Sequence, residues 1–159
     1  MAESANSPAA AGKQVLLQKI YLQDASLEVP QAPQIFTRPW TPQIDVQIGT
    51  AAQTLGADQH QVMLTVTVSA KLDKDTAFVA EVKQTGVFQV LGVDSAAERQ
   101  AVLGAYCPHI LFPFAREAIA DLVQRGGFPQ LLLQPVNFDA LFQDHLSRAA
   151  AAPETSKPH

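Results

Sequence analysis

A long alternation of apolar and polar side chains limits what this chain can fold into more than any other feature. In the run His60–Leu72 every second residue from Val62 onward is apolar, which is the period of a β-strand. One face carries Val62, Leu64, Val66, Val68 and Ala70, and the other carries Met63, Thr65, Thr67 and Ser69. A polar turn at Asp73–Asp75 leads into a second long run, Thr76–Val90, which Gly86 is expected to break. We expect the two runs to pair as a hairpin.

Two other strand patterns precede this hairpin. Val15–Val29 alternates in its second part, and Ile44–Ile48 alternates with polar residues before an irregular connection over 50–59. Between these two strands lies a stretch rich in proline, with Pro30, Pro33, Pro39 and Pro42. This density of proline excludes a helix or a central strand, so the stretch is predicted to be an extended crossing loop.

The apolar period becomes helical after the hairpin. Ser95 and Glu98 have the spacing of a capping box that opens a helix. The pair Cys107–Pro108 is expected to interrupt this helix. A second helix is predicted over residues 109–125, with a kink or restart at Pro113.

The end of the chain has the signals of one more helix. Gly126 and Gly127 end the preceding helix, and Asn137 or Asp139 caps a last one. Its apolar residues are Leu141, Phe142 and Leu146. Strands followed by helices predict an α+β fold, in which a four-stranded antiparallel sheet carries helices packed on one face.

The predicted domain organisation is simple. A single domain is expected over residues 15–148, between a disordered N-terminal tail at 1–14 and a flexible C-terminal tail at 149–159. The chain has no stretch of about 18–20 consecutive apolar residues, so no membrane insertion is expected. The start of the chain lacks the basic and apolar regions of a signal peptide.

Composition restricts the partners. With 11 Lys and Arg against 15 Asp and Glu, the net charge is −4, which disfavours nucleic acid as a partner. Hydrophobic residues make up 47% of the chain and charged residues only 16%. A chain with so few charges has to bury apolar surface in a core, in an oligomer or against ligands.

Catalytic motifs are missing from the sequence. Cys107 is the single cysteine, and its neighbour His109 lies two residues away, a spacing that does not face it on a helix. The four histidines lack metal-binding spacing, and no phosphate-binding or dinucleotide-binding glycine motif is present. We therefore expect no enzyme activity, no cofactor and no metal site.

Three carboxylates are candidates for a docking site. Asp24 and Glu28 share one face of the first strand, about 13 Å apart, too far for a catalytic carboxylate pair. Glu81 joins the same face of the sheet if the strands are neighbours. Two interpretations remain open here, a solvated outer face and an acidic surface that docks a basic partner.

Apolar residues in two places lack an evident place in the core. Ile35, Phe36 and Trp40 lie in the crossing loop, where they either fold back on the core or form the wall of a groove for another chain. The strand over 76–90 is apolar on both faces at residues 77–82. Its second face is expected to be buried in an oligomer or against a substrate.

Four stretches together resemble the SecB family of bacterial protein-export chaperones. They are QKIYLQDASLEVPQAP at 18–33, TAFVAEVKQTGVFQV at 76–90, LGAYCPHILFPFARE at 103–117 and RGGFPQLLLQPVNFDALF at 125–142. The resemblance implies an ATP-independent cytoplasmic chaperone that keeps unfolded precursor proteins competent for translocation and delivers them to the SecA motor. It also implies a homotetramer, assembled as a dimer of dimers.

The resemblance assigns roles to particular residues. It places the contact with the basic, zinc-bearing C-terminal segment of SecA at Asp24, Glu28, Val79 and Glu81. It places the oligomer interface at Ala80, Val82 and Gln84, and makes Ile35, Phe36 and Trp40 the candidates for substrate binding. A single-partner interaction module of the same fold, or a specialised chaperone associated with a toxin–antitoxin pair, is the alternative.

Overall fold

Four long strands precede the main helices in the computed structural model, which describes residues 12–151. The strands are β1 (Gln14–Glu28), β2 (Gln43–Thr54), β3 (Gln59–Leu72) and β4 (Asp75–Leu91). A short 3-10 turn, η1 (Gln34–Thr37), lies between β1 and β2. The later elements are α1 (Ala96–Ala101), the π-helical turn η2 (Val102–Tyr106), α2 (Cys107–Arg125) and α3 (Phe138–Ala151).

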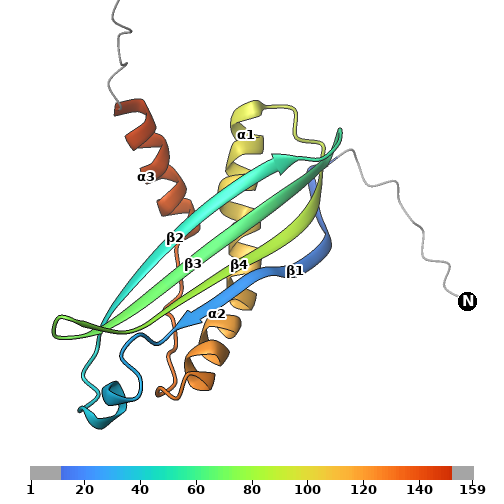
Figure 1. Ribbon diagram of the computed structural model, residues 1–159. Helices are drawn as coiled ribbons and strands as arrows, with labels where there is room; N and C mark the ends of the chain where they lie inside the picture. Colours follow the sequence, from blue (N-terminus) through green and yellow to red (C-terminus); the bar gives the residue numbers. More distant parts are fainter. Residues whose placement is uncertain (1–11, 152–159) are drawn as a thin grey trace, which may run out of the picture.

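The strands form one antiparallel sheet in the order β1-β4-β3-β2 (Figure 1). The predicted hairpin is confirmed as β3 and β4, which occupy the centre and pair along the whole of β3, from Gln59 with Gln89 to Leu72 with Asp75. β1 and β2 are the two edges. The crossing loop, residues 29–42, therefore carries the chain from one edge of the sheet to the other. The predicted α+β fold with a four-stranded antiparallel sheet is confirmed.

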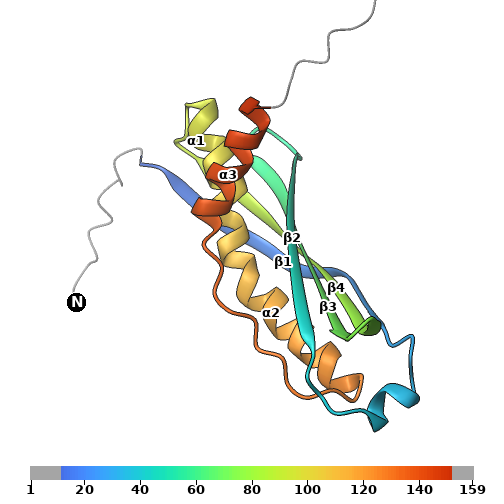
Figure 2. The ribbon, with the colours of Figure 1, turned by 90° about the vertical axis from the view of Figure 1, so that its left-hand side faces the viewer.

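The helices lie on one face of the sheet (Figure 2). That face carries the apolar residues of β3, and Val62, Leu64, Val66, Val68 and Ala70 are fully buried, as their alternation predicts. α2 packs against them and against β4 with a stripe of its own, formed by Leu111, Ala115, Ile119 and Val123. Burial of these side chains is the main source of stability, at about 25 cal/mol for each Å² of apolar surface removed from water.

Two strands differ from their predictions. β2 continues to Thr54, so the irregular connection is limited to residues 55–58. Residues 50–54 have weak alternation because they lie on an edge strand, where backbone pairing with β3 is enough to hold them. The break predicted at Gly86 is wrong, because β4 runs through it. A Cβ at Gly86 would lie 2.8 Å from the Phe88 ring and 3.0 Å from Leu111, so the glycine permits close packing there.

The helical segment is also more continuous than predicted. The predicted helix start is confirmed, since the Glu98 amide donates to the Ser95 hydroxyl, while the Glu98 carboxylate pairs with Lys13 rather than completing the capping box. The interruption at Cys107–Pro108 is wrong, because α1, η2 and α2 follow one another without a break. The Cys107 amide donates to the carbonyl of Val102, five residues back. The wider π turn makes room for Pro108, which has no N–H of its own and would clash in a regular α turn. Pro113 lies inside α2, which continues through it.

The predicted end of α2 and the predicted start of α3 are both confirmed. α2 ends at Arg125, and Gly127, two residues further on, has a φ of +87°, as expected for a glycine just after a helix. Asn137 rather than Asp139 caps α3, because its side-chain oxygen accepts from the Ala140 amide at 3.0 Å. α3 extends to Ala151, so residues 149–151 are helical instead of belonging to the predicted tail. β1 begins at Gln14, the last residue of the N-terminal tail predicted at 1–14. The remaining parts of the two predicted tails, residues 1–11 and 152–159, lie outside the described residues.

Candidate functional site

The outer face of the sheet, opposite the helices, brings four predicted residues together. Glu28 pairs with Val79, and Ser26 pairs with Glu81, so these side chains stand side by side on β1 and β4. Asp24 follows on the same face of β1. We call Asp24, Glu28, Val79 and Glu81 the acidic face. Its carboxylates are open to solvent at β1, while Val79 and Glu81 are half-buried.

Neighbouring strands change the charge of the acidic face in two ways that sequence spacing does not reveal. Lys83 stands directly opposite Asp24, so one cation lies among the carboxylates. On the other side, Val79 pairs with Ser69, which pairs with Asp45 on β2, and this row adds a carboxylate at the far edge. The Thr67 hydroxyl donates to Glu81 Oε2 at 2.9 Å and fixes that side chain. Only the strand register places these residues together.

The predicted oligomer-interface residues do not lie on a surface. Ala80 and Val82 are 0% exposed and Gln84 is 5% exposed within a single chain. They occupy the alternate positions of β4 that point toward the helices, so α2 covers them. The prediction that these three residues contact a second subunit directly is therefore wrong.

The three candidate substrate residues in the crossing loop separate into two groups. Ile35 is 2% exposed and belongs to the core, so its prediction as the wall of an open groove is wrong. Phe36 remains 48% exposed, and Trp40 is half-buried. Their ring centroids lie 5.1 Å and 5.2 Å from that of Phe128, which in turn lies 4.9 Å from that of Phe78. These four rings form an aromatic cluster that joins the crossing loop to the segment after α2.

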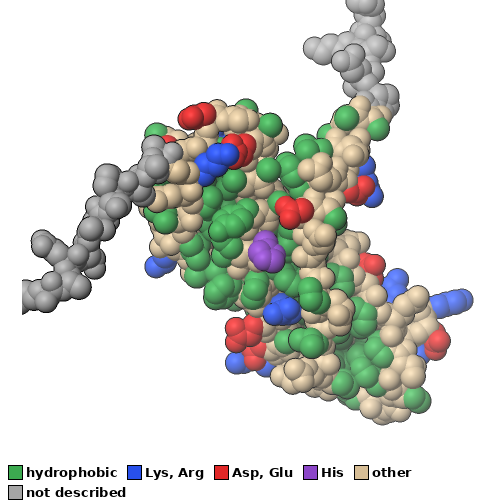
Figure 3. Space-filling view, turned by 180° about the vertical axis from the view of Figure 1, so that it is seen from behind, with side chains coloured by type: hydrophobic (Ala, Val, Ile, Leu, Met, Phe, Trp, Pro, Cys, Tyr) green, Lys and Arg blue, Asp and Glu red, His purple; other side chains and the backbone are tan. Residues whose placement is uncertain are grey.

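An apolar hollow of about 530 Å³ lies along the β2 edge of the sheet. We call it the apolar groove. It is lined by Ile44, Val46 and Ile48 of β2, by residues 131–136 of the connection between α2 and α3, by Phe112 of α2 and by Leu141 of α3. The space-filling view from the helical side shows hydrophobic side chains gathered in patches on that face of the molecule (Figure 3).

The apolar groove continues toward the far end of β2. A hollow of about 340 Å³ shares Ile48 and Leu141 with it, and a third hollow of about 330 Å³ shares Phe142 and His145 with the second. Several lining residues are open to solvent, including Leu132, which is 66% exposed. A row of connected hollows of this length, apolar in its first part and lined by Asp144, His145 and Arg148 further along, suits an extended segment of another chain better than a compact small molecule.

Sequence reasoning missed this groove. The run LLLQPV at 131–136 has no helical or strand period, and it is read as a hydrophobic connection. A signal was present, because three consecutive leucines in an irregular segment cannot all face one core. Leu133 is buried, whereas Leu132 points outward.

The residues considered for catalysis are placed for packing. Cys107 is fully buried, and burial raises the pKa of its thiol to about 12, so it holds its proton. His109 faces away from it, with its ring beside that of Phe138 at a centroid distance of 6.5 Å. Among residues 12–151 no group of three or more His, Cys, Asp or Glu side chains could hold a metal ion. No helix in the same part of the chain is long and apolar enough to cross a membrane.

Comparison with known proteins gives one consistent family. The model described as preprotein translocase subunit SecB matches residues 8–149. A protein of Ectopseudomonas mendocina named protein-export protein SecB is 48% identical over 98% of this chain and 99% of its own length. A protein of the same name from Halorhodospira halophila is 52% identical over 88% of this chain and 80% of its own length.

A solved structure has the same fold. It is a SecB-like chaperone of Mycobacterium tuberculosis in complex with a peptide from an antitoxin, and it matches with a TM-score of 0.64. The match covers 77% of this chain and 90% of that one, at 18% sequence identity. At this identity the likeness concerns the fold.

Proposed function

The chain belongs to the SecB family of protein-export chaperones, and we propose that it binds unfolded precursor proteins and delivers them to the SecA motor. In this proposal it works in the cytoplasm as a homotetramer, a dimer of dimers, and needs neither ATP nor another cofactor. Its clients stay competent for translocation because they are held before they fold. The observation that carries the proposal is the apolar groove, together with the hollows that continue it along β2.

The chemistry of the groove fits an unfolded client. Unfolded chains expose aliphatic and aromatic side chains, and each buried CH₂ group contributes about 0.8 kcal/mol. Ile44, Val46 and Leu132 are 37%, 41% and 66% exposed, so they are free to contact such side chains. The groove offers few polar groups that would select one sequence. Repeated four times in a tetramer, weak contacts of this kind add up to useful avidity.

Phe36 and Trp40 remain our candidates for substrate contacts, as partly exposed members of the aromatic cluster. They lie beside Phe128, where the segment that lines the apolar groove begins. We place them at the end of the client path. Ile35 supports them from the core.

The acidic face is our candidate for the SecA contact. A basic, zinc-bearing segment of SecA would meet Asp24, Glu28 and Glu81, with Val79 as the apolar contact among them. Exposed charges of this kind increase the rate of association and make binding sensitive to salt. The zinc ion belongs to the partner in this proposal.

Two variants separate the two surfaces. Val46→Asp with Leu132→Asp places charge in the apolar groove, and Asp24→Lys with Glu28→Lys inverts the acidic face. We expect the groove variant to bind reduced, carboxamidomethylated α-lactalbumin about tenfold more weakly, with SecA binding unchanged. The acidic-face variant should show the reverse. Titration of both variants with the unfolded protein and with SecA at low salt measures the two effects.

Each alternative predicts a different result. If the protein is an interaction module with one folded partner, the wild type itself would not reduce the aggregation of unfolded clients. A chaperone specialised for an antitoxin would protect that antitoxin but not export precursors. SecA affinity that is unchanged in the Asp24→Lys, Glu28→Lys variant would contradict the role of the acidic face. Client holding that is lost in Cys107→Ser would contradict the non-enzymatic reading.

A further inference from the structure

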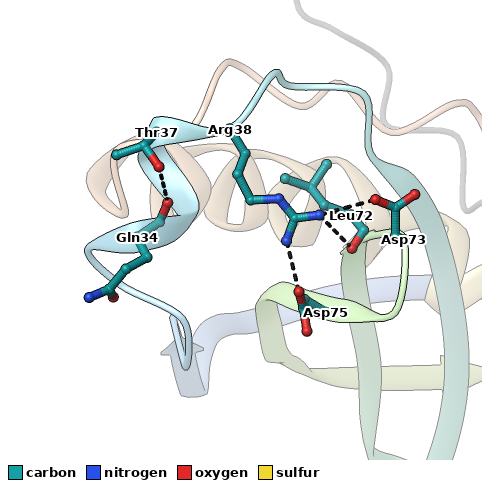
Figure 4. A network of polar contacts seen from close by, with 6 residues as sticks. All are labelled: Gln34, Thr37, Arg38, Leu72, Asp73 and Asp75. Atoms are coloured by element: carbon teal, nitrogen blue, oxygen red, sulfur yellow. Dashed lines mark hydrogen bonds and ion pairs between the residues drawn. The ribbon is translucent and has the colours of Figure 1, made fainter.

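Arg38 ties the crossing loop to the turn between β3 and β4 (Figure 4). Its Nη1 donates to Asp75 Oδ2 at 2.8 Å, and its Nη2 lies 3.2 Å from Asp73 Oδ2. The same Nη2 also donates to the carbonyl oxygen of Leu72 at 3.3 Å. We call these contacts the Arg38 latch. It connects two segments that lie 34 to 37 residues apart in the chain.

The local structure on both sides holds the latch in place. Asp73 adopts a φ of 54° in the two-residue turn, a conformation that aspartate tolerates better than most residues. On the loop side, the Thr37 hydroxyl donates to the carbonyl oxygen of Gln34 at 2.7 Å and tightens the turn before Arg38. The planar guanidinium matches the arrangement of acceptors because its N–H groups point in fixed directions.

The position of Arg38 in the crossing loop connects the latch to the aromatic cluster. Phe36 lies two residues before it and Trp40 two residues after it, and both rings contact Phe128. Phe128 begins the segment whose residues 131–136 line the apolar groove. The latch therefore fixes the loop that carries two of the four rings of the aromatic cluster at this end of the groove.

We propose that Arg38 is a positioning residue for client binding, an inference that rests on the proposed function. The latch holds the crossing loop in one place, so Phe36 and Trp40 are already ordered at this end of the groove before a client binds. A loop that is already ordered loses less conformational entropy when the complex forms. Arg38 acts through these rings and need not touch the client.

The latch should affect position more than stability. Asp73 and Asp75 are 92% and 53% exposed, and Arg38 is 32% exposed, so water screens the ion pairs. Exposed ion pairs contribute little to the free energy of unfolding. Ile35 and the aromatic cluster keep the loop attached to the core when the latch is removed, so the loop should become looser without unfolding.

The test uses Trp40 as its probe. It is the single tryptophan of the chain, so its fluorescence reports on the loop alone. In Arg38→Gln we expect its emission to shift to the red in the free protein, with the unfolding midpoint near that of the wild type. The dissociation constant for carboxamidomethylated α-lactalbumin should rise about three- to tenfold. Arg38→Lys should give emission and affinity values between those of the wild type and Arg38→Gln. Lysine keeps the charge but lacks the planar set of N–H donors of the guanidinium.

Two further variants complete the design. Asp73→Asn with Asp75→Asn removes the acceptor charges and should reproduce the effects of Arg38→Gln on emission and affinity. Arg125→Gln is the matched control, since it removes an arginine from an exposed ion pair with Asp121 at 2.9 Å, at the end of α2. It should leave the Trp40 emission and the client affinity unchanged.

The failure of the proposal is distinct from the failure of the proposed function. A wild-type chain that does not bind the unfolded protein contradicts the proposed function, and with it any role of Arg38 in client binding. Normal binding by the wild type with equal or tighter binding by Arg38→Gln contradicts the positioning role alone. So does a shift of the Trp40 emission without any change in affinity.

Discussion

Gly104 allows the last helix to approach the middle of the long helical segment. It lies in the π turn η2, and a Cβ at this position would lie 2.6 Å and 2.8 Å from two ring carbons of Phe142. Phe142 comes from α3 and lines the hollows that continue the apolar groove. The absence of a side chain at one residue thus sets how closely α3 approaches η2.

Gly104→Ala is therefore expected to destabilise the fold. The added methyl group has to push the Phe142 ring, and overpacking of this kind costs about 1–3 kcal/mol. Urea unfolding followed by circular dichroism measures the change. Gly49→Ala is the matched control, since a Cβ there meets nothing within 4 Å, and its effect should stay within about 0.5 kcal/mol. Equal stability of the two variants would contradict the packing argument.

His60 makes the stability of the sheet depend on pH. It is buried near the β2–β3 turn, with Nδ1 3.3 Å from the Thr54 hydroxyl. Burial lowers its pKa below 6.5, the nearby Arg99 lowers it further, and Asp58 raises it in part. The unfolded chain therefore binds more protons than the folded one just below pH 6.5. The contribution of His60 to the free energy of unfolding is therefore complete above that pH, and it is lost as the pH falls.

His60→Gln tests this origin of the pH dependence. Between about pH 7.5 and about pH 5.5, the urea midpoint of the wild type should fall further than that of the variant. The comparison uses the difference between the two proteins, so titration elsewhere cancels. Parallel curves for the two proteins would show that His60 does not carry the effect.

At the scale of the strand, register decides the charge of the acidic face. Lys83 stands opposite Asp24 and reduces the attraction of this surface for a basic segment. Lys83→Gln should therefore tighten SecA binding about two- to fivefold at low salt, and the gain should shrink as salt is added. Binding titrations at two ionic strengths measure it. Lys19→Gln is the control, because it removes the same charge from the same sheet at a position outside the acidic face.

Strand and helix types follow from the sequence because their residues repeat with the right period. Val62, Leu64 and Val66 have the alternation that predicts the buried face of β3, and the structure buries all three. The π turn escaped prediction because Pro108 is a breaker in an α-helix, and only a shift of hydrogen bonding from four to five residues accommodates it. Period alone carries no information about such a shift.

The site is less predictable than the fold for a physical reason. Asp24, Glu28 and Glu81 were found because each lies on the outer face of its own strand. Lys83 and Asp45 complete that surface only through pairing between strands, which a single sequence does not state. The apolar groove depends on a connection without secondary structure, residues 126–137, whose path is determined by packing against β2 and α2.

At the scale of the whole molecule, one chain leaves apolar surface uncovered at both edges of its sheet. On β1, Leu16, Leu17 and Leu22 are 46%, 42% and 50% exposed. The outer edge of β1 has no neighbouring strand among the described residues. Exposed apolar residues on an open edge favour association with another copy of the chain. The β2 edge borders the apolar groove, so we expect copies of the chain to associate through β1.

This division of the two edges predicts the behaviour of the assembly. The native mass by light scattering should be roughly four times the 17.1 kDa of one chain. Leu17→Glu with Leu22→Glu should lower that mass, because a carboxylate at an apolar interface loses its water without gaining a partner. The circular dichroism spectrum should stay unchanged, since both side chains are already partly in water.

Leu55→Glu is the matched control for this variant. Leu55 is 49% exposed at the turn between β2 and β3, neither of which pairs with β1, and its replacement should keep the native mass of the wild type. Loss of the assembly should also weaken client binding even though each groove stays intact, because avidity requires several grooves at once. A wild-type monomer, or full assembly in the Leu17→Glu, Leu22→Glu variant, would contradict the assignment of β1 to the interface.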